Sequence, residues 1–408
     1  MLNFAQQIKK KKMKRVVDRN YLVPFLLIAS LFFLWGFAHS ILDVLNKHFQ
    51  DVLVISKSRS ALVQAMVYSG YFVMALPAGA VIRKWGYKAG VLCGLALYGL
   101  GALMFIPGGQ MMNFSFFLLC LFVIGCGLTF LETSANPYVT VLGAPETSAS
   151  RLNLAQSLNG LGWIAGPLVG SLVVLSDADG NGGGNLTAPY AVIGVVVLLI
   201  AIVFSRAKLP EIQESFEGTV DDKDQKLWSQ WKFSFGVIAL FFYVAAQTGI
   251  NSFFINYTIE TIPSVSAKTA GLILSFGGMG LFMFGRVTGS QVMKHIRAEK
   301  LLTVLALIAS LTMLAVIFGR GYFSMAAILL CYLCESIMFP TIFALAIKGL
   351  NPENTKKGSS YLIMTIVGGA VAPVLMGVIG ETQMALGFFV PLVCFFVILA
   401  YGLRYSKA

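Results

Sequence analysis

Long apolar runs, separated by short polar loops, follow one another along the whole chain. Each run is close to the ~20 residues that a helix needs to cross the hydrocarbon core of a bilayer. The strict polar–apolar alternation of a transmembrane β-barrel is missing. The pattern therefore predicts an all-α integral membrane protein with twelve transmembrane helices, at about residues 21–48, 58–82, 88–106, 113–142, 149–175, 187–206, 233–261, 268–294, 300–318, 321–349, 357–380 and 383–404.

Composition and charge agree with this interpretation. Hydrophobic residues make up 57% of the chain and charged residues 12%, whereas soluble proteins carry about 25% charged residues. The formal net charge is +12, but the basic residues lie in loops and form no basic helix face of the kind that binds nucleic acid. They gather at one end of the apolar runs, so we expect a multi-pass protein of the inner (cytoplasmic) membrane with both termini in the cytoplasm.

The two halves of the chain repeat several motifs in the same order. Glu132-x4-Pro137 returns as Glu335-x4-Pro340, and the segment FFLWGFAHSILD at 32–43 resembles FFYVAAQTGINS at 241–252. Two such repeats around a site near the bilayer midplane are a common plan of transporters. We predict two pseudo-symmetric six-helix bundles, N-terminal at 1–206 and C-terminal at 233–408, joined by a cytoplasmic linker at 207–232.

One carboxylic acid, Glu132, lies far along the fourth apolar run among apolar neighbours. A charge at the bilayer centre costs at least ~2.5–3.5 kcal/mol, so an acid in such a helix is a functional candidate. Asn136 follows at i+4 on the same helix face. Pro137 comes next and would open the backbone where a cavity can satisfy it. We predict that Glu132 takes part in proton coupling.

A second acid, Asp43, lies in the first predicted helix. Trp35, His39 and Asp43 fall at i, i+4 and i+8, so they share one face of that helix. Asp43 is therefore a second candidate for proton coupling. The alternative is that Asp43 forms a local ion pair with Lys47 at i+4, worth a few tenths of a kcal/mol.

Amide and aromatic side chains recur at helical spacing in the later runs. Amides both donate and accept hydrogen bonds, and an aromatic ring covers the apolar C–H face of a sugar, so these stripes suit a polyhydroxylated ligand. The alternative is a clamp between helices, worth about 0.6 kcal/mol for each contact. The predicted substrate-binding residues are Gln156, Asn159, Asn136, Trp163, His39, Gln247, Asn251 and Tyr361.

Other chemistry-bearing groups are sparse. The six cysteines fall in apolar runs, where they act as small fillers, and the three histidines form no metal cluster. A nucleophile–base pair and a phosphate loop are also missing, so we expect a transporter with no cofactor or metal, and not an enzyme. The small-residue pairs Gly166/Gly170 and Gly285/Gly289 predict close helix packing.

The chain resembles the major facilitator superfamily in the loop GAVIRKWGYK at 79–88, although Arg83 stands where that family usually has an acid. Within the superfamily it resembles the fucose/glucose–galactose permease family, of the fucose:proton symporter type. The motifs that carry this resemblance are FLETSANPYVTVLG (130–143), RLNLAQSLNGLG (151–162), FGR (284–286), SIMFPTIFALA (336–346) and IVGGAVAPVLMG (366–377).

The resemblance implies that Glu132 and Asp43 carry proton coupling and that Gln156 and Asn159 contact the sugar. Gln247 departs from the family pattern, which often has an acid there, and the identity of the sugar stays open. We expect proton-coupled symport of a monosaccharide by alternating access, in a monomer whose partners are the sugar, protons and membrane lipid. A proton-coupled antiporter of another solute and a sugar sensor with a transporter fold are the alternatives.

Overall fold

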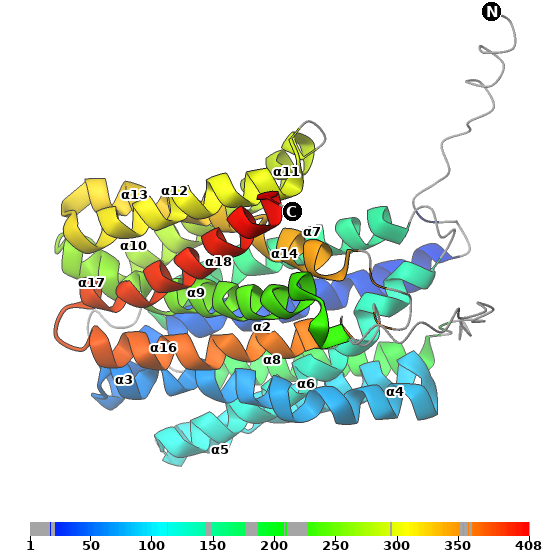
Figure 1. The fold of residues 1–408 in the computed structure, drawn as a ribbon. Coiled ribbons are helices and arrows are strands. Elements are labelled where there is room, and N and C mark those ends of the chain that lie inside the picture. The colour runs from blue at the N-terminus through cyan, green and yellow to red at the C-terminus, as the bar shows by residue number, and fades with distance from the viewer. Residues whose placement is uncertain are drawn as a thin grey trace, which may run out of the picture.

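The computed structural model describes residues 21–111, 113–142, 148–175, 187–207, 227–293, 296–348 and 361–407, with single positions at 17, 209, 350, 354 and 358. These residues form helices that run side by side in one bundle (Figure 1). Most of the predicted linker at 207–232 lies outside the described residues. The helices of the first half are α2 (Leu22–Leu53), α3 (Lys57–Ser60), α4 (Leu62–Leu103), α5 (Phe105–Met111), α6 (Phe114–Val141), α7 (Ser148–Val169), η3 (Gly170–Val174) and α8 (Thr187–Arg206).

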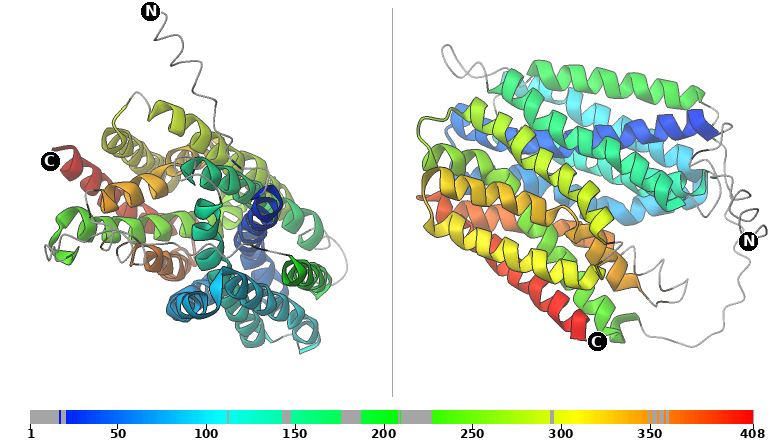
Figure 2. Two further views of the ribbon diagram at one scale, coloured as in Figure 1. Left: turned by 90° about the vertical axis from the view of Figure 1, so that its right-hand side faces the viewer. Right: turned by 90° about the horizontal axis from the view of Figure 1, so that it is seen from above.

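The second half continues the same architecture. Its helices lie on the other side of the bundle, coloured from green through yellow to red where the first half runs from blue to green (Figure 2). They are η5 (Leu227–Ser229), α9 (Trp231–Thr261), α10 (Ala267–Leu272), η6 (Ile273–Met279), α11 (Gly280–Val292), α12 (Ala298–Phe318), α13 (Gly321–Glu335), α14 (Met338–Ile347), η7 (Thr365–Val367), α16 (Gly368–Ile379), α17 (Met384–Gly387) and α18 (Phe389–Lys407).

The apolar runs of the sequence are helical where the structure describes them. Eleven helical spans in the described residues are long and apolar enough to cross a membrane, and Tyr190–Arg206 in α8 is a shorter apolar helix at the predicted sixth position. Large apolar side chains such as Leu76, Val192 and Phe318 stay exposed on the bundle surface. Such a surface is expected where lipid, and not water, is the solvent.

Backbone breaks differ from those that the prolines suggest. α6 continues through Pro137 to Val141, so the predicted opening of the backbone at Pro137 is wrong. In the second half the helix instead breaks just after Glu335, and α14 begins at Met338. The bend between the second and third spans falls at Gly86, whose φ of 80° and ψ of 173° suit glycine.

Small residues bring α2 and α7 together. A Cβ added to Gly166 would lie 2.0 Å from Ser40 Oγ, and one added to Gly170 would lie 2.9 Å from Val44 Cβ. The Ser40 hydroxyl also donates to the Gly162 carbonyl at 3.1 Å. In the second half, Gly285 and Gly289 face α13 in the same close way. The predicted packing role of both glycine pairs is confirmed.

Contacts between α2 and α9, between α7 and η6 and between α4 and α16 are among those that join the two halves. Asn46 on α2 donates to the Ser252 carbonyl on α9 at 2.6 Å. Ser275 on η6 donates to the Ile164 carbonyl on α7 at 2.7 Å. α4 packs against α16, where a Cβ on Gly369 would lie 2.8 Å from the Tyr68 ring.

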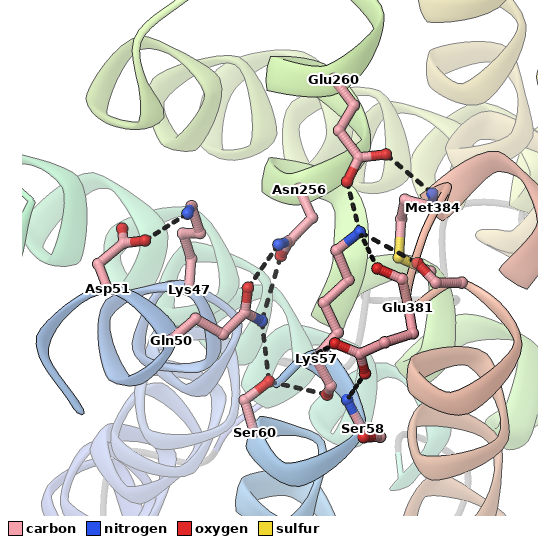
Figure 3. Close-up of polar contacts among 11 residues, drawn as sticks. Lys47, Gln50, Asp51, Lys57, Ser58, Ser60, Asn256, Glu260, Glu381 and Met384 are labelled. Carbon is pink, nitrogen blue, oxygen red and sulfur yellow. Dashed lines mark hydrogen bonds and ion pairs between the residues drawn. The ribbon is translucent and has the colours of Figure 1, made fainter. Parts of the chain in front are cut away.

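The halves are also joined at the end of the bundle that lies opposite the C-terminus of α18 (Figure 1 and Figure 3). The Lys57 ammonium lies 2.5 Å from Glu260 Oε1 and donates to the Gly380 carbonyl at 3.0 Å and the Glu381 carbonyl at 3.2 Å. The Glu381 carboxylate accepts from the backbone N–H groups of Lys57 and Ser58. We call this set of contacts the Lys57 network.

Candidate functional site

Glu132 lies inside the first half, where three helices meet. Its side chain is 18% exposed, and Oε1 accepts a hydrogen bond from the Tyr71 hydroxyl on α4 at 2.5 Å. That hydroxyl lies 2.8 Å from Nε2 of His39 on α2. His39 Nε2 and Glu132 Oε1 are 3.7 Å apart, so the tyrosine oxygen bridges them. The carboxyl is thus connected to α2 and α4 and is directed into the bundle.

An aromatic group surrounds the imidazole of His39. The Trp163 ring on α7 lies nearly parallel to it, with centroids 6.2 Å apart and an interplanar angle of 6°. Tyr68 stacks on the same imidazole at 5.4 Å. Trp163 is half-buried, whereas His39 and Tyr68 are buried. This arrangement provides flat apolar faces beside a hydrogen-bonding acid, which suits a ligand with both C–H and hydroxyl surfaces.

Asp43 lies one turn along α2 from His39 and is buried. Its Oδ1 accepts from the Gln64 amide on α4 at 2.9 Å. The predicted alternative, an ion pair with Lys47, is wrong, because Lys47 pairs with Asp51 at 2.5 Å. The second oxygen, Oδ2, has no hydrogen-bond partner among the described residues.

The predicted amides divide into two groups. Asn159 donates from Nδ2 to the Phe32 carbonyl on α2 at 3.1 Å, which is the helix clamp that the sequence left as an alternative. Within the described residues, Oδ1 of Asn136 and Oδ1 of Asn251 are buried without a partner. Such acceptors are costly unless something pairs with them. Gln156 and Gln247 are half-buried.

Two candidates lie apart from this group. Tyr361 is 40% exposed, and its ring lies 5.1 Å from the Trp228 ring in η5. The structure therefore does not bring Tyr361 to His39 and Glu132. Glu335, the counterpart of Glu132 by repeat, is fully buried, and its carboxyl accepts a hydrogen bond from the Cys331 thiol at 3.8 Å.

A groove of about 500 Å³ lies between α12 and α14. Arg297, Glu299 and Lys348 contribute its charged lining. None of the predicted proton-coupling or sugar-binding residues lines it. We therefore place the candidate site at the Glu132–Tyr71–His39 chain, where the buried acid and the aromatic faces lie together.

Sequence reasoning missed Tyr71. Gln64, Tyr68 and Tyr71 fall at i, i+4 and i+7 of α4, so they form one polar stripe on the helix face that meets Asp43 and Glu132. The spacing of Gln64 and Tyr68 therefore points to Tyr71 as well. Tyrosine counts as hydrophobic in an apolar run, so hydropathy alone gives no signal for Tyr71, although its hydroxyl needs a partner when buried.

Comparison with known proteins decides the family. The pattern of the Major Facilitator Superfamily matches residues 25–373. The chain belongs to the major facilitator superfamily. This transporter is 36% identical over 411 residues to the L-fucose-proton symporter of Escherichia coli strain K12, covering 94% of this chain and 93% of that protein. It is 35% identical over 397 residues to a glucose/galactose transporter of Brucella abortus, covering 96% of each.

Solved structures give the same answer for the fold. The crystal structure of the E. coli fucose:proton symporter in the outward conformation matches this major facilitator chain with a TM-score of 0.68 at 36% identity, over 96% of this chain and 100% of that one. A bacterial homologue of the lysosomal transporter Spinster, inward-facing and occupied, matches with a TM-score of 0.78 at 13% identity, over 96% and 98%. The predicted family, the helical fold and the assignment as a transporter and not an enzyme are confirmed.

Proposed function

We propose that this major facilitator transporter carries a monosaccharide together with protons across the inner membrane by alternating access. The observation that supports this most directly is the Glu132 carboxyl, held inside the bundle by Tyr71 beside the parallel rings of His39 and Trp163. Sequence identity of 36–37% with L-fucose–proton symporters, along nearly the whole chain, supports the same function.

The chemistry of symport follows from the cost of moving a carboxylate through the membrane. A charge at the bilayer centre costs at least ~2.5–3.5 kcal/mol, and protonation of Glu132 removes that charge before the halves rearrange. The neutral acid has an O–H group to donate to its surroundings, which the carboxylate lacks. Binding of the sugar and binding of the proton therefore favour each other.

The remaining candidate residues have different proposed roles in binding the sugar and the proton. Trp163 covers a C–H face of the sugar, and the free Oδ1 atoms of Asn136 and Asn251 accept from its hydroxyls. Gln156, Gln247 and His39 add further polar contacts, and Asn159 positions α7 against α2. Asp43, held by Gln64, exchanges protons with the site. Tyr361 contacts substrate only in a conformation that moves it toward the bundle centre.

The membrane potential supplies the driving force. One proton moving inward through ~100 mV releases ~2.3 kcal/mol. At ~1.4 kcal/mol for each factor of ten, this energy sustains a sugar gradient of nearly fiftyfold. A second coupled proton, at Asp43, would square that ratio.

Both termini lie in the cytoplasm, so the Lys57 network lies at the outer face. It holds Lys57 of the first half to Glu260 and Glu381 of the second. The conformation described here is then closed toward the outside. Opening toward the outside must break these contacts, which is the exchange that alternating access requires.

Uptake by purified transporter in proteoliposomes tests the function. Vesicles with an inward proton gradient are given L-fucose, glucose, galactose and mannose, each with a proton ionophore control. Accumulation that the ionophore abolishes supports symport. Sugar efflux driven by proton entry identifies an antiporter, and saturable sugar binding with no flux identifies a sensor; either result overturns the proposal.

A further inference from the structure

Three groups from three helices form one hydrogen-bonded chain, and its protons can be counted. The Tyr71 hydroxyl carries a single proton, which it donates to Glu132 Oε1 at 2.5 Å. Its oxygen, 2.8 Å from His39 Nε2, must then accept from an Nε2–H. A neutral imidazole has one N–H, so His39 Nδ1 is a bare acceptor. Nδ1 is buried and has no partner among the described residues.

We infer that Tyr71 and His39 form a proton relay to Glu132, and that the relay reverses the hydrogen-bonding character of His39 Nδ1 when the coupling proton binds. A proton arrives at Nδ1. The Nε2 proton moves to the Tyr71 oxygen, and the original Tyr71 proton moves to Glu132 Oε1. One proton has entered, one carboxylate has become a carboxylic acid, and imidazole and phenol are again neutral.

The product of this transfer differs from the starting state in every link. The Glu132 carboxyl now donates to the Tyr71 oxygen, Tyr71 donates to Nε2, and Nδ1 bears the remaining proton. Nδ1 has changed from an acceptor to a donor, with no change in the heavy-atom positions. Since His39 stacks on Trp163, the atom that reverses lies within the group of rings that we propose for the sugar. Only the protonated carrier can therefore donate a hydrogen bond from Nδ1 to a sugar oxygen.

Other ionisable groups surround Glu132 without taking part in this chain. α4 presents Tyr68, whose oxygen lies 3.4 Å from the Thr248 hydroxyl across the interface between the halves. α2 presents Asp43, which Gln64 holds. On α7, buried Arg151 directs its Nε to the Val139 carbonyl at 3.1 Å. Among the described residues only Tyr71 donates a hydrogen bond to the Glu132 carboxyl, and it therefore positions the acid and connects it to His39.

The inference rests on the proposed function but can be tested apart from transport. The chain has three histidines, so ¹⁵N-imidazole labelling gives three resolvable rings, and His39→Gln assigns the one of interest. In the parent protein at about pH 8 we expect His39 to be the Nε2–H tautomer. In Glu132→Gln, whose amide N–H donates to Tyr71 as the O–H of the neutral acid does, we expect the Nδ1–H tautomer at the same pH. A His39 ring that has the same tautomer in both proteins, or that is doubly protonated in either, overturns the relay.

Transport variants provide the second test. Tyr71→Phe removes the bridging hydroxyl, and Tyr98→Phe removes one from a buried tyrosine on the same helix outside the chain. We expect Tyr71→Phe to lower pH-driven sugar accumulation at least tenfold while sugar exchange at equal pH persists, and Tyr98→Phe to match the parent. Should Tyr71→Phe fail to fold, the His39 tautomer in the parent and in Glu132→Gln still tests the relay. Full accumulation by Tyr71→Phe rules the relay out, whereas a parent protein that accumulates no sugar rules out the proposed function instead.

Discussion

At the scale of single residues, two buried acids that the sequence pairs by repeat have different surroundings. The Glu132 carboxyl accepts a hydrogen bond from a tyrosine on another helix, whereas the Glu335 carboxyl, among the described residues, accepts one only from a weak thiol donor one turn away on its own helix. A carboxyl that changes charge during transport needs partners for both of its states. The contrast supports the proposal that Glu132 is the acid that carries proton coupling.

The first prediction concerns this difference. Glu132→Gln is expected to abolish accumulation driven by a pH gradient, because the amide cannot release a proton. Sugar exchange at equal pH should survive, since the amide imitates the neutral acid. Uptake and exchange in proteoliposomes measure both, and Glu335→Gln is the matched comparison. Uphill accumulation by Glu132→Gln at the parent level would remove this residue from the coupling step.

A second prediction distinguishes the amide that holds two helices together, Asn159, from an amide proposed to contact the sugar, Gln156. Asn159→Ala removes the hydrogen bond to the Phe32 carbonyl, so we expect a loss of about 0.6 kcal/mol in the free energy of unfolding. Gln156→Ala, at a half-buried position on the same helix, should weaken sugar binding and leave stability within about 0.5 kcal/mol. Thermal unfolding in detergent with and without sugar measures the two effects. Equal stability losses in both variants would contradict the division.

The candidate residues could be found from sequence, but their partners could not. Glu132 and Asp43 were recognisable because charge in an apolar helix is expensive. The expected partner of Asp43 was Lys47, which is near in sequence, yet Gln64 on α4 takes that place and Lys47 turns to Asp51. Helical spacing specifies a face of one helix and not which neighbouring helix covers it, so contacts between helices remained undetermined.

At the scale of elements, the length of the apolar runs predicted the helices well, but it did not predict local irregularities within them. The described helices match the expected segments within a few residues. The wider turns of η3 and η6 and the break after Glu335 have no signal in hydropathy, because they arise from packing. Pro137 is the reverse case, since a residue that often bends helices lies within an unbroken one.

The third prediction uses the one bend with an unusual backbone. At Gly86, φ of 80° and ψ of 173° lie where side chains are strongly disfavoured. Gly86→Ala should therefore lower stability by roughly 1–3 kcal/mol. Gly280→Ala is the control, because Gly280 has helical φ and ψ and an added Cβ would meet nothing within 4 Å. At Gly280 alanine should be neutral or stabilise the protein by up to about 1 kcal/mol. Thermal unfolding that finds Gly280→Ala less stable than Gly86→Ala would refute the backbone strain argued for position 86.

At the scale of the whole molecule, the Lys57 network determines which end of the bundle is closed. Lys57 is 14% exposed, and its ammonium uses its three donors on Glu260 and two carbonyls of the 380–381 turn. The side-chain pair Gln50–Asn256 lies beside it, at 2.6 Å between Asn256 Nδ2 and Gln50 Oε1. These contacts link α2 and α3 to α9 and to the turn before α17, so the halves cannot part at this end while they persist.

The fourth prediction is that Lys57→Gln shifts the population toward opening at this end. Loss of about 1 kcal/mol of ion-pair energy corresponds to a shift of about fivefold. Spin labels at Val54 and Ser264, in a chain whose native cysteines are replaced, report the separation of the halves. Lys47→Gln is the matched control, because the Lys47–Asp51 pair lies within α2. Lys57→Glu combined with Glu260→Lys should restore closure, and an unchanged distance in Lys57→Gln would show that the network does not hold the halves.

The same network should be insensitive to pH in the range where transport is coupled to protons. Burial raises the pKa of Glu381, but hydrogen bonds from the backbone N–H groups of Ser58 and Lys57 outweigh burial, and the pKa is lowered. Opening removes those bonds, and the pKa returns to an ordinary value of about 4.3. A group whose pKa is depressed in the closed state stabilises closure above the ordinary pKa and loses that contribution only as pH falls through the depressed one. Between about pH 6 and pH 8, Glu381→Gln should therefore reduce the closed fraction by the same factor at every pH. A Glu381→Gln effect on the Val54–Ser264 distance that grows or vanishes across this range would contradict the assignment, and would place part of the pH sensing at the Lys57 network instead of at Glu132.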